Sequence, residues 1–281
     1  MTTDDDLKIA KEGIILVGEV IKAAGDNPNV KAAGNEIGKT VLTVTRTINN
    51  ALIPLAAVNF AFDKARAYFA ERFQSDLAAK ARAIPPDQVV EPKASIAGPA
   101  LQGLAFAHEE PDLKEMYLSL LSSAMDGRVS ASIHPAFVEI IRQLSSEEAR
   151  LIQSSLRTSG GIPIAELRLF DNKSGTWEVL YRHLLNFQNP TTHAPIENLR
   201  IPAFVDNWTR LGLVDVDYAK YVATEKIYDW VEQRPEFLRL KTERENDASK
   251  VTFQKGVIAR TSLGEQFAAA VGVIANQIPG K

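Results

Sequence analysis

Residues 111–128 read PDLKEMYLSLLSSAMDGR and lie at the centre of the stretch, 92–156, that decides the fold. Apolar side chains recur there every three or four residues, which puts them on one face of an α-helix: Leu113, Met116, Tyr117, Leu120 and Leu121. Pro111 suits the first helical turn, where its missing N–H would have no partner anyway. Asp126-Gly127 is a stop signal, because glycine adopts the left-handed backbone without steric cost.

Two more helices are expected with almost no loop between them. Pro135 is placed to begin a helix whose apolar side chains again share one face: Phe137, Ile140, Ile141 and Leu144. Ser145 and Glu148 have the spacing of a capping box, which begins the next helix. Upstream, we interpret Gly98-Pro99 as a turn. Short connections between amphipathic helices are typical of a compact bundle.

The same stretch resembles the Abi-alpha family of bacterial proteins. The resemblance rests on the order of these motifs: Ile96-x-Gly98-Pro99-Ala100-Leu101, Leu-Lys-Glu-Met at 113–116, Met125-Asp126, and His134-Pro135-x-Phe137-Val138-Glu139-Ile140-Ile141-x-x-Leu144-Ser145. It extends from about Ala65 to Phe267 and is strongest from Ile84 to Ala149. The family is named for abortive infection, the shutdown of a phage-infected cell, so the resemblance implies a shared fold and a role in phage defence. It implies no reaction, because it brings no catalytic motif.

Composition narrows the class of protein. A chain of 281 residues suits one large domain or two ordinary ones, and 45% hydrophobic with 24% charged residues excludes wholesale disorder. The net charge of −3 creates no strong field that would recruit nucleic acid or anionic lipid. The absence of cysteine excludes disulfides and thiolate chemistry and fits a reducing cytoplasm. The acidic N-terminus lacks the basic region of a secretory signal.

We divide the chain into an N-terminal helical arm at 1–83, a central helical bundle at 84–145 and a C-terminal domain at 146–281. The arm contains the most apolar segment, residues 41–62. Polar residues and a proline interrupt it, which excludes a simple transmembrane helix: Arg46, Asn49, Asn50, Pro54 and Asn59. Two interpretations remain, a core helix kinked at Pro54, which we favour, and a segment that sits on or inserts into a bilayer when triggered.

The C-terminal domain has the element order of a winged helix. We expect these elements in turn: a helix at 199–213, a strand at 214–216, strands at 251–253 and 257–259, and a last helix from Thr261. An insertion from Tyr218 to about Ser249 separates the first two strands, and 224–233 within it predicts a helix. The connection 171–195 shows no readable pattern. The predicted fold class is mainly α: a helical arm and a helical bundle, then a winged-helix-like domain with a small β-sheet.

His134, Asp126 and Arg128 are the candidate functional residues of the bundle. His134 precedes a helix, where a side chain commonly satisfies free backbone donors, so a structural role competes with a functional one. Asp126 and Arg128 place a charged pair at a turn, although Asp-Gly is first of all turn chemistry. We find no metal-ligand spacing and no nucleophile or phosphate-binding motif. We therefore predict no catalytic residue, no cofactor and no metal, and a protein that is not an enzyme.

The candidate functional residues of the C-terminal domain lie on or near the helix expected at 199–213, which would be the DNA-recognition helix of a winged helix: Arg200, Asn207 and Arg210. Acidic residues nearby bring this surface close to neutral: Glu197, Asp206, Asp215 and Asp217. Binding of duplex DNA depends largely on cationic side chains that contact phosphates, which a nearly neutral surface does not favour. Winged helices also bind proteins, and we prefer this interpretation for the C-terminal domain.

We predict an abortive-infection protein that acts without catalysis, through protein or membrane binding. In this hypothesis the C-terminal domain senses a partner and residues 41–62 supply the effector. The alternative is a DNA-binding transcriptional regulator that uses the winged-helix-like domain. We expect a protein partner and retain two further hypotheses, membrane association through residues 41–62 and a homo-oligomer. The expected location is the cytoplasm, at the periphery of the inner membrane if residues 41–62 bind lipid.

Overall fold

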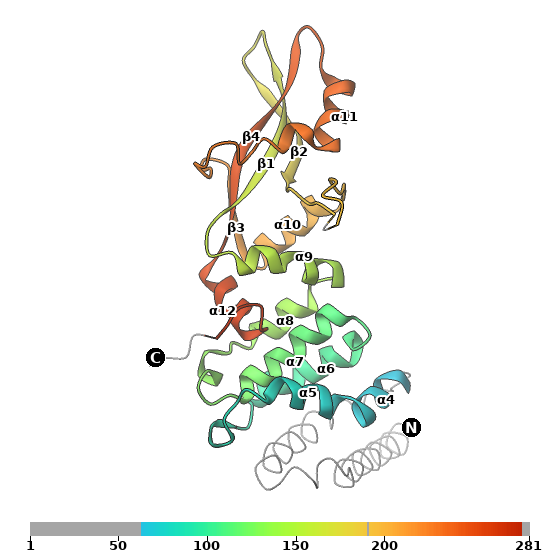
Figure 1. Ribbon diagram of the computed structural model, residues 1–281, viewed down its shortest axis with the longest axis vertical. Coiled ribbons are helices and arrows are strands. Elements are labelled where there is room, and N and C mark those ends of the chain that lie inside the picture. Colours follow the sequence, from blue (N-terminus) through green and yellow to red (C-terminus); the bar gives the residue numbers. More distant parts are fainter. Residues whose placement is uncertain (1–62, 190, 277–281) are drawn as a thin grey trace, which may run out of the picture. The chain divides into compact units, whose positions relative to one another are not determined.

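The computed structural model describes residues 63–189 and 191–276 (Figure 1). The apolar segment 41–62, with both of its interpretations, lies outside them. The contacts separate two compact units: of the described residues, unit 1 holds those up to Arg150 and from Gln266 onward, and unit 2 holds those from Leu151 to Glu265. Within the described residues, no helix has the length and apolar character that a membrane crossing requires.

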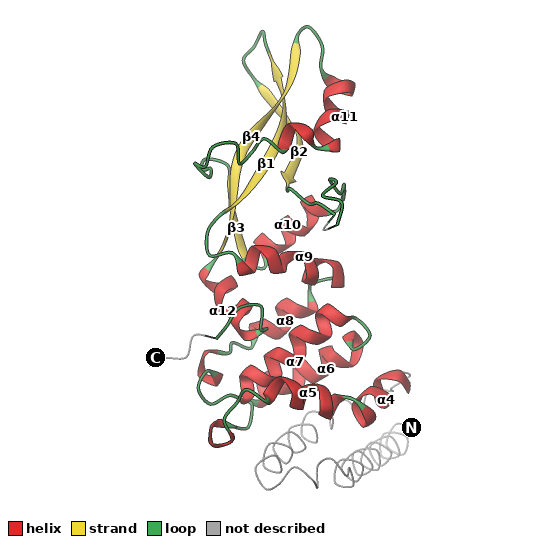
Figure 2. Cartoon of the chain, in the orientation of Figure 1, coloured by secondary structure: helices red, strands yellow, loops and turns green. Residues whose placement is uncertain are grey.

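The predicted class, mainly α with a small C-terminal sheet, is confirmed (Figure 2). In the described part of the chain, six helices come before the first strand: α4 (Asp63–Glu71), α5 (Phe73–Ala81), α6 (Ala94–Ala107), α7 (Pro111–Met125), α8 (Ala136–Arg142) and α9 (Ser146–Arg157). Then follow β1 (Ile162–Asp171), β2 (Trp177–Leu184), α10 (Ile201–Arg210), β3 (Val214–Asp217), α11 (Pro235–Arg244), β4 (Ser249–Arg260) and α12 (Ser262–Ala270).

Helix α7 is the centre of unit 1. It has the predicted bounds, but every residue from Met116 to Met125 is buried, so the helix is covered on all sides and not along one stripe alone. Helices α5, α6 and α8 pack against it (Figure 1). On α6, a Cβ atom at Gly103 would overlap the ring of Tyr117, so the glycine allows the two helices to approach each other closely.

The helix boundaries in unit 1 confirm one local prediction and correct two. The Ser145 N–H donates to Glu148 Oε2 at 2.9 Å and the Glu148 N–H donates to Ser145 Oγ at 3.3 Å, which is the predicted capping box. Gly127 does follow α7, but its backbone is not left-handed. A Cβ atom there would lie 3.0 Å from the Gln88 carbonyl oxygen, a tight contact that glycine avoids. Gly98-Pro99 lies inside α6 and is not a turn.

Unit 2 contains a four-stranded antiparallel sheet in the order β2-β1-β4-β3. The two strands expected at 251–253 and 257–259 are one continuous strand, β4, which pairs with all of β1 from Ile162↔Ile258 to Asp171↔Ser249. The insertion forms turns and a 3-10 turn at Val231–Gln233 where a helix was predicted, and its α-helix is α11. Strand β2 lies in the connection that showed no pattern, and its register with β1 shifts twice.

The two faces of the sheet differ. One face carries the core of unit 2, where strand residues such as Ala165, Leu167 and Val251 pack against Tyr228, Val231 and Phe237 from the insertion. Side chains alternate along a strand, so the intervening residues lie on the other side. We call this second surface the open face and define it by Glu166, Arg168, Phe170, Trp177, Val179, Arg182, Lys250, Thr252 and Gln254.

Candidate functional site

Asp126 and Arg128 form an ion pair at the end of α7. Arg128 Nε donates to Asp126 Oδ1 at 2.8 Å and Nη2 donates to Oδ2 at 2.6 Å. Arg128 Nη2 also donates to the Ala83 carbonyl at 3.2 Å, and the Gly127 N–H donates to the Gln88 carbonyl at 2.7 Å. Burial alone would raise the pKa of Asp126, but the hydrogen bonds and charge of Arg128 together lower it below its ordinary value. The pair ties the connector after α5 to the end of α7.

His134 is exposed at the start of α8, where its Nδ1 accepts a hydrogen bond from the Ala136 N–H at 3.1 Å. The contact satisfies one of the backbone donors that a helix leaves free at its N-terminus. This is the capping geometry that the structural interpretation of His134 describes.

Asn207 and Arg210 lie in the last turn of α10 and Arg200 directly precedes its first turn, all in the other unit from Asp126, Arg128 and His134. The helix buries one side in unit 2: Ile201, Phe204, Val205 and Trp208. Arg210 Nη2 donates to Asn207 Oδ1 at 2.7 Å, and the Arg200 guanidinium lies 4.9 Å from the centre of the Phe204 ring. Arg200, Asp206 and Arg210 are exposed, so α10 presents a polar face of mixed charge.

A buried histidine that we had not singled out lies next to this face. His183 Nε2 is 3.1 Å from Asp206 Oδ1, and its Nδ1 is 3.0 Å from Tyr218 Oη. Both contacts fit a neutral imidazole that donates to Asp206 and accepts from the phenol. Burial lowers the pKa of His183 despite the opposing effect of Asp206, and burial raises the pKa of Tyr218 to about 12. Neither side chain is therefore poised as a charged catalyst at neutral pH.

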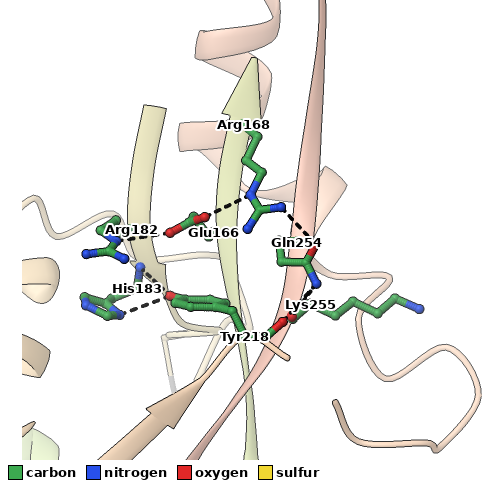
Figure 3. Close-up of polar contacts among 7 residues, drawn as sticks. All are labelled: Glu166, Arg168, Arg182, His183, Tyr218, Gln254 and Lys255. Atoms are coloured by element: carbon green, nitrogen blue, oxygen red, sulfur yellow. Dashed lines mark hydrogen bonds and ion pairs between the residues drawn. The ribbon is translucent and has the colours of Figure 1, made fainter. Parts of the chain in front are cut away.

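The polar contacts continue from Tyr218 onto the open face (Figure 3). Gln254 Nε2 donates to the Tyr218 carbonyl at 3.0 Å, and Gln254 Oε1 accepts from Arg168 Nη1 at 3.0 Å. Glu166, which is 2% exposed, accepts from Arg168 Nε at 2.9 Å and from Arg182 Nε at 3.1 Å. One network thus joins Asp206 on α10 to two arginines on the open face. In the sequence, the apolar residues Ala165, Leu167 and Leu169 alternate with the polar residues Glu166 and Arg168. This alternation is the signal that marks the strand, although we had not singled it out.

On the covered face, the insertion and β4 line a cavity of about 550 Å³. The Lys255 ammonium lies 5.4 Å from the centre of the Tyr228 ring and 5.8 Å from that of Tyr221, and all three residues line the cavity. Three carboxylates also line it: Glu225, Asp229 and Glu232. Residues 63–189 and 191–276 contain no cluster of three or more histidine, aspartate or glutamate side chains placed to hold a metal ion.

Comparison with known proteins gives one family. The model of the family described as abortive infection alpha matches residues 65–271. No curated protein matches the chain. An uncharacterized protein of known structure, from the hydrocarbon-degrading marine bacterium Alcanivorax borkumensis SK2, is 22% identical over 48% of this chain and 92% of that chain, with a TM-score of 0.30.

Proposed function

The chain belongs to the abortive infection alpha family, as its motifs predicted, and from this premise we propose that it acts in phage defence by binding a protein partner, without catalysing a reaction. The observation that carries the proposal is the exposed face of α10. The helix is anchored by a buried apolar side that includes Trp208, which is 0% exposed. Directly before it lies Leu199, 69% exposed and next to Arg200. An exposed leucine beside arginine, at the start of a fixed helix, is a surface suited to a protein interface.

A second candidate is the DNA-binding regulator, because α10 leads into β3 and its antiparallel partner β4, as the recognition helix of a winged helix leads into the wing. Charge argues against it. Acidic and basic residues are equal in number between Leu151 and Glu265, and Asp206 is exposed between Arg200 and Arg210. Non-specific duplex binding rests on cations that release counterions from phosphates. The protein partner therefore remains our proposal, with a cytoplasmic location, peripheral to the inner membrane if residues 41–62 engage lipid.

The test is a phage challenge of host cells with and without the gene, at low and high phage dose. We expect protection at low dose and collapse of the culture at high dose. Leu199→Asp should abolish protection, because it replaces the exposed apolar side chain of the proposed interface with a carboxylate that binding would have to desolvate. Leu238→Asp is the matched control, since Leu238 is an exposed leucine of α11 at 51% exposure. It should protect as the wild type does.

Three results would count against the proposal. The first is no protection by the wild type over a broad phage panel. The second is full protection by Leu199→Asp, which would remove α10 as the interface. The third is salt-dependent retention of duplex DNA by the full-length protein together with loss of retention in Arg210→Glu, which would favour the regulator.

A further inference from the structure

The open face of the sheet has two cross-strand rows of side chains with different chemistry. In the outer row, Trp177, Phe170 and Lys250 are directly paired across β2, β1 and β4. In the next row, Val179, Arg168 and Thr252 are paired in the same way. Paired residues on antiparallel strands place their side chains next to each other on one face. Aromatic, cationic and hydroxyl groups therefore lie in reach of a single bound chain.

Trp177 offers one free side of its indole ring. The Arg168 guanidinium lies 3.7 Å from the centre of that ring, yet Trp177 is 51% exposed. Arg168 is itself fixed by Glu166 and Gln254, at 2.9 and 3.0 Å (Figure 3). The indole is thus held in place from one side, and a planar group can stack on the other side without ordering the tryptophan first.

Two cationic side chains on this face, Arg182 and Lys250, have hydrogen-bond donors that no described residue uses. Arg182 uses Nε for Glu166, and its side chain is 60% exposed. No described residue accepts a hydrogen bond from its Nη1 or Nη2. Lys250 is exposed and makes no ion pair with a residue of the described ranges. The acidic residue of the face, Glu166, is buried beneath the two arginines, so the charge at the surface is positive. A polyanion is the chemical complement of such a surface.

We propose that the open face binds single-stranded RNA, with a base stacked on Trp177 and phosphates held by Arg182 and Lys250. The inference does not depend on the proposed function, which concerns α10. Stacking on an exposed aromatic ring needs an unpaired base, so a duplex does not fit, and base stacking with cationic contacts is how sheet surfaces hold single strands. RNA is chosen over DNA because the Thr252 hydroxyl, which has no hydrogen-bond partner among the described residues, lies beside Arg168 and can bond a ribose 2′-OH.

The test uses full-length protein and a labelled single-stranded RNA of about 12 nucleotides, within the site sizes of such surfaces. Fluorescence anisotropy at about 50 mM salt should show binding that weakens with added salt. With the two phosphate contacts of Arg182 and Lys250, the slope of log affinity against log salt should be about −1.4. Trp177→Ala should weaken binding at least about fivefold. Arg182→Glu should weaken it and reduce the steepness of the salt slope by about 1.

Two control variants lie on the covered side of the same sheet. Lys255→Glu is matched to Lys250→Glu, because both lysines are exposed on β4 and their side chains lie on opposite faces. Tyr221→Ala is matched to Trp177→Ala, since Tyr221 is 64% exposed at the cavity of the insertion. Neither control should change the affinity for RNA. Trp177→Phe keeps a stacking ring and should bind nearly as the wild type does, but without the quenching of tryptophan fluorescence that stacking on Trp177 produces.

Any of four results would overturn the proposal. One is no binding of RNA at low salt. Another is binding that Trp177→Ala and Arg182→Glu leave unchanged, or that the two controls weaken equally. A third is binding of duplex DNA, or of single-stranded DNA of the same sequence, more tightly than RNA. The last is binding of a polyglutamate peptide in place of RNA with the same dependence on Arg182, which would assign the face to an acidic protein.

Discussion

Arg234 and Glu236 form a bidentate ion pair inside unit 2, with Nε and Nη2 of the arginine donating to the two carboxylate oxygens at 3.0 and 2.7 Å. The two residues are only 2% and 1% exposed. The arginine also donates to the carbonyls of Phe187 and Ile196 at 2.7 and 2.8 Å. The pair therefore fastens the long connection after β2 to the first turn of α11.

Arg234→Met should destabilise the protein by about 3–5 kcal/mol, because it leaves the Glu236 carboxylate buried without its cation. Denaturant unfolding at neutral pH measures this. Arg239→Met is the control: Arg239 pairs with Glu197, and its side chain is 42% exposed, so the loss should stay below about 1 kcal/mol. Equal losses in the two variants would show that burial of the Arg234 pair does not govern its contribution.

Gly103→Ala should destabilise unit 1 by about 1–3 kcal/mol, since the added methyl group overlaps the Tyr117 ring and forces α6 and α7 apart. Gly98→Ala, on the same helix, is the matched control. Apart from its chain neighbours, a Cβ atom at Gly98 meets nothing within 4 Å, so the cost of alanine should be limited to its contact with the ring of Pro99 and should stay below that of Gly103→Ala. Thermal unfolding of both variants measures the difference, and a Gly103→Ala variant as stable as the wild type would contradict close packing at this point.

The sequence predicts unit 1 better than unit 2 because the signals in unit 1 are local. Helix α7 is predicted by an initial proline, the helical spacing of its apolar residues and the Asp-Gly pair that ends it, all within one segment. The Ser145–Glu148 capping box is predicted by two residues three positions apart. Gly98-Pro99 misleads, because a proline in a buried helix is tolerated where packing outweighs one lost hydrogen bond.

In unit 2 the informative contacts join residues far apart in the chain. Trp177 and Arg168 meet only after β1 and β2 pair, and the two register shifts of β2 destroy the alternation that would mark it as a strand. Arg234-Pro235-Glu236 reads as an exposed helix start, and nothing in its composition predicts that both charges are buried. The sequence therefore does not predict which residues share the open face, because that depends on how distant strands pair.

Arg128→Gln should destabilise unit 1 at neutral pH, because it removes the partner of a carboxylate that is 6% exposed. The pKa of Asp126 is lowered in the folded protein, so its contribution is present above the unfolded pKa of about 3.9 and disappears as pH falls through the folded value. The stability difference between wild type and variant should therefore shrink in acid. Arg142→Gln, which loses an exposed pair with Glu139, should show a small difference in the unfolding free energy at neutral pH.

His183 makes the stability of unit 2 depend on pH between neutrality and mild acid. Burial lowers the pKa of His183 in the folded protein, so the unfolded chain takes up the proton more readily. The stability that the neutral imidazole contributes is therefore present above the unfolded pKa of about 6.5 and is lost as pH falls below it. In His183→Asn this part of the pH dependence should vanish. Asparagine suits the site because the backbone φ of +57 is one that it adopts readily.

The direct measurement is an NMR titration of the His183 ring, whose midpoint should lie below about 6.5. Asp206→Asn separates the causes: Asp206 raises the pKa of His183 through its charge and hydrogen bond, so removing the charge should lower the midpoint further. Arg182 acts in the same direction as burial, and Arg182→Gln should raise the midpoint. A wild-type midpoint above about 6.5 would mean that the Asp206 carboxylate outweighs burial, and acid would then stabilise unit 2 through His183.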